Sequence, residues 1–302
     1  MKYSILLLLV FSFYSNAQTK YDIHDELLFD AYDQKESGNC ELALQTYRSA
    51  IELIKPSSGR SYFLAAECAI KIGKMEVADE WIRMGVTQAG APLSYLREFD
   101  GFQNVQNETF YKTIIADYNI LRRQYFSSIE NIDLYNEVEQ LTFRDQFVRK
   151  TGMYLDGISE QDYQEAGDGF SKAREEKDTI KGKEFKKILF HQTAAKYNET
   201  TTDLMQKVDS LNIARLMEIT AEHGWQSRAW IILWHQRGTY GEDNYVWNYF
   251  KPVIDEEIAV GTMSRSFWDT FDQFKEIMET GTFGTIQLGE RPKIRGKTEE
   301  KN

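Results

Sequence analysis

The sequence has little cysteine, proline and histidine, and after its first residues it has no apolar run of transmembrane length. Only two of the 302 residues are cysteine and four are proline, whereas 42% are hydrophobic. These values exclude a disulfide-rich scaffold, a collagen-like chain and a disordered low-complexity chain. A chain of this length buries enough surface to form one or two hydrophobic cores without a metal or a disulfide.

Positive charge is also scarce, with 36 lysines and arginines against 47 acidic residues and a net charge of -11. Because no face is rich in lysine or arginine, we expect neither nucleic acid nor an anionic membrane as a partner. The four histidines form no His-Glu-x-x-His motif, and no glycine-rich phosphate loop is present. We therefore predict no metal and no cofactor, although Asp145, Asp209 and His235 leave a carboxylate–histidine metal site open as an alternative.

The first 17 residues have the pattern of a secretory signal peptide. Lys2 supplies the positive start, residues 5–13 form a short apolar run, and Ser15-Asn16-Ala17 is a small-residue cleavage site. The run is shorter than the roughly 20 apolar residues of a membrane-spanning helix. We expect cleavage near Ala17 and export to a periplasm or to the outside of the cell, without a lipid anchor because no cysteine follows Ala17.

Cys40 and Cys68 are the two cysteines, and an oxidising compartment would permit a disulfide between them. If they lie on neighbouring antiparallel helices that turn near Ser57, their positions differ by about 9 Å along the helix axis. This offset exceeds the reach of a disulfide bond. The sequence therefore predicts two packed, unbonded thiols.

Small residues recur in the first hundred residues when the chain is shifted against itself by 35 positions. The pattern covers residues 22–92 and resembles the tetratricopeptide repeat, in which helices pack closely where the facing side chains are small. Two such repeats need a cap, and the aromatic-rich segment 93–118 is expected to supply it as a packing helix. The matching pairs are Ala31 with Ala66, Gly38 with Gly73, Ala43 with Ala78, Tyr47 with Ile82, and Ala50 with Gly85.

Four short polar boxes follow in the second half of the chain. Their order resembles an uncharacterised bacterial family, a domain of unknown function often found behind helical repeats, over residues 138–288. The resemblance implies a mainly helical domain and brings no settled activity. The boxes are Asp145-Gln146-x-x-Arg149, Asp209-x-x-Asn212, His223-Gly224-Trp225 and Trp234-His235, with a later Phe283-Gly284-Thr285.

The whole chain is thus predicted to be all-α. We expect a signal peptide at 1–17, tetratricopeptide-like hairpin repeats and their cap at 18–125, a helical domain at 126–288 and a disordered tail at 289–302.

Helix geometry indicates which polar residues meet. His223 lies eleven residues after Asn212 on one predicted helix, about 16 Å away, and so belongs elsewhere. If the next helix starts near Ser227 and folds back, His235 is level with Asn212. The sequence therefore allows a cluster, and its members are Asp145, Arg149, Asp209, Asn212 and His235.

This cluster has two interpretations. In the first, His235 acts as general base on a bound water, Arg149 stabilises negative charge and Asn212 orients the substrate. In the second, a buried polar network fixes the register of the helices. No serine or cysteine nucleophile motif accompanies the cluster. We therefore favour an exported helical-repeat binding protein that takes a protein or peptide on the repeat face; the alternative is a hydrolase of an envelope peptide or glycan.

Overall fold

The computed structural model describes residues 19–280, apart from 57, 156 and 190–194. Over these residues the chain is helical and contains no β-strand, which confirms the expected all-α fold. No helix in the described ranges is long and apolar enough to cross a membrane. The predicted signal peptide, the predicted tail and the Phe283-Gly284-Thr285 box lie outside the described residues.

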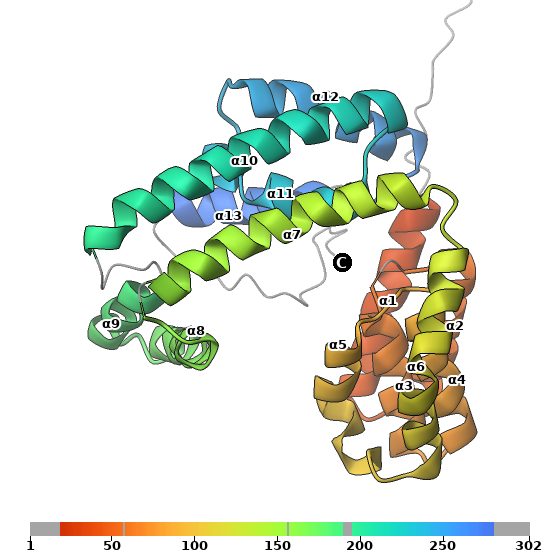
Figure 1. Cartoon of the computed structure of the whole chain (residues 1–302). Helices are drawn as coiled ribbons and strands as arrows, with labels where there is room; N and C mark the ends of the chain where they lie inside the picture. The colour runs from red at the N-terminus through yellow and green to blue at the C-terminus, as the bar shows by residue number, and fades with distance from the viewer. Residues whose placement is uncertain (1–18, 57, 156, 190–194, 281–302) are drawn as a thin grey trace, which may run out of the picture.

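Two helical hairpins form the first part of the described chain (Figure 1). The second helix of one packs against the first helix of the next. Gly38 and Gly73 occupy corresponding turns with φ of +83° and +74°, a left-handed backbone that glycine adopts without strain. The four helices are α1 (Lys20–Glu36), α2 (Cys40–Leu53), α3 (Arg60–Lys71) and α4 (Met75–Thr87).

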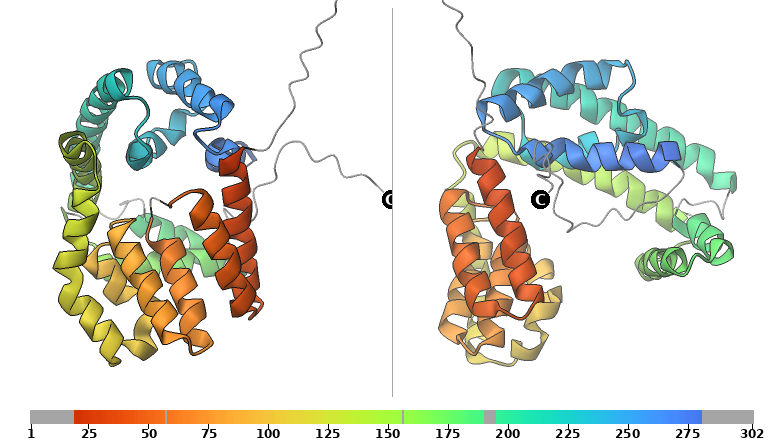
Figure 2. Two further views of the ribbon diagram at one scale, coloured as in Figure 1. Left: turned by 90° about the vertical axis from the view of Figure 1, so that its right-hand side faces the viewer. Right: turned by 180° about the vertical axis from the view of Figure 1, so that it is seen from behind.

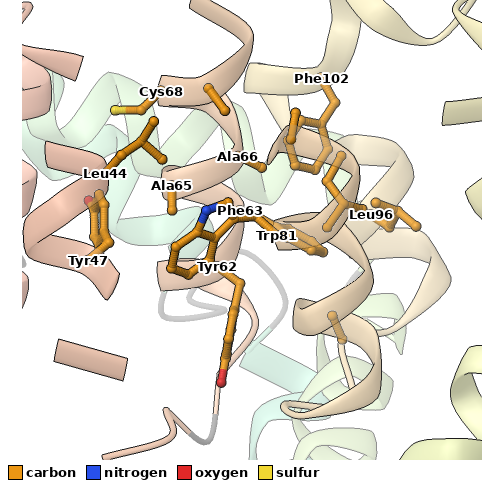
Figure 3. Packing of buried hydrophobic residues seen from close by; sticks show 14 of the residues in the cluster. Leu44, Tyr47, Tyr62, Phe63, Ala65, Ala66, Cys68, Trp81, Leu96 and Phe102 are labelled. Atoms are coloured by element: carbon orange, nitrogen blue, oxygen red, sulfur yellow. The ribbon is translucent and has the colours of Figure 1, made fainter. Parts of the chain in front are cut away.

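Aromatic side chains close the end of the two hairpins. The ring centroid of Phe63 on α3 lies 5.4 Å from that of Phe99 and 5.1 Å from that of Phe102. Figure 3 shows Phe63 and Phe102 among the buried residues that we call the N-terminal core. The predicted packing role of segment 93–118 is confirmed, since α6 packs on α4. The segment contains α5 (Leu93–Glu98), η1 (Asp100–Val105) and the start of α6 (Thr109–Ser127).

Small residues lie where these helices touch. Ala31, Ala43, Ala66 and Ala78 are all 0% exposed. At Gly85 on α4 an added Cβ would lie only 2.6 Å from the Phe63 ring. The 35-residue spacing in the sequence therefore marks positions of helix contact, because a larger side chain at any of them would separate the helices.

Gly85→Ala is expected to lower the free energy of unfolding by about 1–3 kcal/mol, since the new methyl group overlaps a buried ring. The matched control is Gly167→Ala in α8 (Glu160–Glu175), where an added Cβ meets nothing within 4 Å. The control should leave stability unchanged or raise it by about 0.5–1 kcal/mol through helix propensity. Urea unfolding followed by circular dichroism measures both, and a Gly85→Ala protein as stable as the parent would contradict the packing described.

Both cysteines are unbonded and buried, at the start of α2 and in the last turn of α3. Burial and the neighbouring Cys40 raise the pKa of Cys68 to about 12. Both thiols are thus free and buried, as the sequence predicts.

The second part of the chain is built on two long helices, α7 (Ile132–Leu155) and α10 (Ala195–His223), which pack against each other (Figure 1). The helices α8 and α9 (Thr179–Leu189) form a hairpin near one end of α7. Shorter elements cover the other side of the α7–α10 pair (Figure 2): η2 (Ser227–Ala229), α11 (Trp230–Trp234), η3 (Arg237–Thr239), α12 (Tyr245–Val260), η4 (Arg265–Trp268) and α13 (Asp269–Thr280).

Gly224 ends α10, as the sequence predicts. It has a φ of +76° and comes directly after the last helical residue. The helix expected from Ser227 is shorter than predicted. It ends at Trp234, so that His235 is the residue that caps α11. The apolar residues beneath these elements, which we call the C-terminal core, include Leu141, Leu216 and Phe250.

Among the described residues, the two parts touch between α1 and η4 and beside the α6–α7 connection. Between α1 and η4, Arg265 Nε lies 3.3 Å from Asp22 Oδ2, and the Ser266 hydroxyl donates to Asp25 over 3.2 Å. Beside the α6–α7 connection, Arg228 donates to the Tyr125 hydroxyl of α6 and pairs with Glu139 of α7 at 2.7 Å. These contacts join the parts through polar groups, while each keeps its own apolar core.

Candidate functional site

Asp145 is the centre of the predicted polar cluster, and it is 1% exposed. Its carboxylate accepts hydrogen bonds from Arg149 Nη1 at 2.8 Å and from Gln146 Nε2 at 2.7 Å. His235 Nδ1 lies 2.8 Å from Asp145 Oδ2 and 3.0 Å from Oδ1. Three donors therefore surround a buried carboxylate, which satisfies a group that would be costly to bury alone.

Arg149 connects this carboxylate to α10. Its Nη2 lies 3.0 Å from both carboxylate oxygens of Asp209, while its Nη1 holds Asp145. Burial raises the pKa of Asp209, and the charge and hydrogen bonds of Arg149 oppose that rise. The network thus ties α7 to α10 through Arg149 and to the end of α11 through His235.

Among the described residues, Asn212 forms no hydrogen bond with the other four members of the predicted cluster. Its amide is 0% exposed and donates from Nδ2 to the Leu141 carbonyl oxygen over 3.2 Å, while its Oδ1 has no partner among the described residues. His223 lies outside the network, as expected, with its Nε2 3.5 Å from Glu222. Asn212 therefore fixes the register of α7 against α10 and is not placed to orient a substrate beside His235.

The network does not resemble a metal site. Among the residues that the structure describes, no three histidine, cysteine, aspartate or glutamate side chains are placed to hold a metal ion. Arg149 occupies the position between Asp145 and Asp209 that a cation would take.

A second candidate site lies beside α1, α3 and α5, and the sequence did not identify its residues. Two cavities of about 590 Å³ and 400 Å³ share Arg60 and Leu64 of α3. We call them together the repeat groove. The larger cavity continues along α5 to Tyr95 and Phe99, and the smaller continues along α1. The other lining residues of the smaller cavity include Leu28, Phe29, Tyr32 and Tyr47. Ser266 lines the end of this cavity that lies next to the second part of the chain.

The polar groups of the repeat groove differ in how they are satisfied. Lys35 is buried between Glu36 at 2.9 Å and Glu67 at 3.1 Å, and these bonds raise its pKa against the opposing effect of burial. Arg60 forms no ion pair with any described residue. The hydroxyl of Tyr47 is buried without a hydrogen-bond partner in the described ranges, and burial raises the pKa of this phenol. The groove therefore contains one cation without an ion-pair partner in the described chain, Arg60, and its lining also includes the acidic side chains of Asp25, Glu98 and Asp100.

These groove residues carry no sequence motif. Arg60 and Tyr47 are separated along the chain and meet only because α2 and α3 pack. The 35-residue repeat in the sequence predicts a binding face, but it does not indicate which polar residues lie on that face. Comparison with known proteins adds no identity: no protein-family model, no curated protein and no solved structure matches this chain.

Proposed function

We propose that the protein is an exported helical-repeat binding protein whose repeat groove takes a segment of a peptide or protein. The observation that carries this proposal is that Arg60, which has no ion-pair partner among the described residues, lies beside the apolar and aromatic side chains of the smaller cavity. Ligand sites combine such walls with a few polar groups that fix orientation.

The groove also favours a particular ligand chemistry. A carboxylate of the bound segment pairs with Arg60, since guanidinium groups bind carboxylates through two parallel hydrogen bonds. An apolar side chain next to that carboxylate enters the smaller cavity, against Phe29, Tyr32 and Leu64. The preferred ligand is therefore an acidic residue, or a free carboxyl terminus, beside a large apolar residue.

Selection from a random peptide library on the immobilised full chain tests this proposal. The enriched peptides should carry a carboxylate close to a large apolar residue. Arg60→Met should weaken their binding about tenfold or more, because a hydrogen bond to a charged group contributes about 1.5–3 kcal/mol. Arg123→Met is the matched control, since Arg123 is an exposed arginine on α6 that does not line the groove.

Two outcomes would contradict the proposal. One is a selection without enrichment over a blank support. The other is a set of peptides that bind the Arg60→Met protein as tightly as the parent, which would place the binding site elsewhere on the chain.

A second candidate function, hydrolysis of an envelope peptide or glycan, is favoured by one feature of His235. When its Nδ1 donates to Asp145, Nε2 carries the lone pair that a general base uses. No described residue forms a hydrogen bond with Nε2, and the side chain is 14% exposed. Asp145 would then hold the imidazole in the required tautomer, as in other histidine–carboxylate pairs.

For this second candidate, His235→Gln should abolish turnover in a panel of peptide and glycan substrates while the helical circular dichroism spectrum is retained. Glutamine keeps a hydrogen-bond donor toward Asp145 and removes the base. If the parent turns over no substrate of a broad panel, or if the variant retains the activity, the general-base role of His235 is wrong.

A further inference from the structure

Arg237 is a half-buried arginine at the start of η3, two residues after His235. Its guanidinium carbon lies 4.6 Å from the ring centroid of Trp234 and 5.0 Å from that of Phe274. Nη1 donates to the Trp234 carbonyl oxygen over 3.0 Å, whereas Nε is buried without a hydrogen-bond partner among the described residues. The guanidinium is therefore held by two aromatic rings and one carbonyl, with donors left over.

No carboxylate of the described chain pairs with Arg237. Several other arginines of the second part of the chain have an acidic partner: Arg149 has Asp145 and Asp209, Arg215 has Glu137 and Glu218, Arg228 has Glu139, and Arg265 has Asp22. A buried charge is normally paired, because its desolvation is otherwise uncompensated. The surroundings of Arg237 are thus those of a cation whose anionic partner is not a side chain of the described chain.

The positive charge of the neighbouring Arg149 makes the binding of an anion beside Arg237 more favourable. Burial, and then the positive charge of Arg149, lower the pKa of Arg237. An anion beside Arg237 would reverse both effects, since it replaces lost hydration and offsets the repulsion between the two guanidinium groups. Because the two rings fix the guanidinium plane before a ligand arrives, little side-chain entropy is lost on binding.

We propose that Arg237 binds the carboxylate of a ligand with an aromatic or apolar body. Trp230 is 44% exposed, and its ring centroid lies 6.2 Å from that of Trp234, so an aromatic surface leads away from Arg237. The unpaired cation supplies one positive charge, which a monoanionic carboxylate neutralises. A phosphate dianion would leave excess negative charge close to the Asp209 carboxylate that Arg149 already holds. This site is separate from the repeat groove and does not depend on the function proposed for it.

Calorimetric titration of the full chain with phenylacetate tests the proposal. Phenylacetate should bind saturably, the neutral phenylacetamide should not bind, and inorganic phosphate should bind more weakly than phenylacetate. Arg237→Met should weaken phenylacetate binding at least tenfold. Arg215→Met is the matched control, because it removes a surface arginine with two acidic partners and should leave the affinity unchanged.

Arg237→Lys keeps the charge and serves as a second variant if the methionine protein fails to fold. Its affinity should also fall, because lysine lacks the planar fork that stacks between the rings. The absence of saturable phenylacetate binding would overturn the proposal. Equal affinity in the parent and in a folded Arg237 variant, or tighter binding of phosphate than of phenylacetate, would overturn it as well.

Discussion

Replacing Asp145 with alanine is expected to destabilise the protein by about 3–5 kcal/mol, the range for breaking a buried ion pair by removing one partner. The variant leaves His235 and Gln146 without their shared acceptor and leaves Arg149 with Asp209 alone. Because these groups belong to α7, α10 and the end of α11, the loss loosens the contact among three elements. Urea unfolding followed by circular dichroism gives the change in free energy.

Asp203→Ala is the matched control for this prediction, since Asp203 is an exposed aspartate on α10, the helix that packs against α7. Its free energy of unfolding should stay within about 0.5 kcal/mol of the parent. An Asp145→Ala protein that is as stable as the Asp203→Ala protein would show that the network contributes little to the fold.

Phe63→Ala is expected to cost a similar 3–5 kcal/mol, roughly the range for removing a buried aromatic ring. Phe63 is 0% exposed and contacts the rings of Tyr95, Phe99 and Phe102. It is therefore an apolar link between the second hairpin and its cap. Thermal and urea unfolding should both show the loss, together with faster proteolysis within α5 and η1.

Phe143→Ala is the control for Phe63, because the Phe143 side chain is 68% exposed on α7. It should change stability by less than about 0.5 kcal/mol. If Phe63→Ala proved equally mild, segment 93–118 would not be held to the hairpins by the aromatic packing described above.

The parts of the fold that were predictable from the sequence depend on local signals. Gly38 and Gly73 mark turns because only a residue without a Cβ adopts their φ readily. Ala43 and Ala78 mark helix contacts because larger side chains would not fit there. These signals need no knowledge of which helices meet, so a single sequence reveals them. The identity of the repeat family stays a prediction.

The polar cluster was predictable only in part. Asp145 and Arg149 are one helical turn apart, so their contact follows from local geometry. The contact between Asp145 and His235 was predictable only by assuming that the helix after Gly224 folds back against the preceding one. Asn212 was placed on the right helix face, but its amide bonds to a backbone carbonyl of α7. The partner of this amide depends on how α7 and α10 cross, and the spacing of residues along the chain does not determine that crossing.

Two residues with proposed binding roles escaped the sequence analysis for the same reason. Arg60 stands out because it lines both cavities, and Arg237 because its buried Nε has no partner among the described residues while two aromatic rings lie against its guanidinium. Each of these properties depends on the whole neighbourhood in space. Within the sequence they are ordinary members of a chain with 36 lysines and arginines.

The most direct test of the central claim, that the repeat groove binds a peptide segment, is amide hydrogen–deuterium exchange of the full chain with and without a selected peptide. We predict slower exchange in α1, α3 and α5, the helices that line the groove, and no slowing in the Arg60→Met protein at the same peptide concentration. Slower exchange confined to α4, or to the second part of the chain, would contradict the claim.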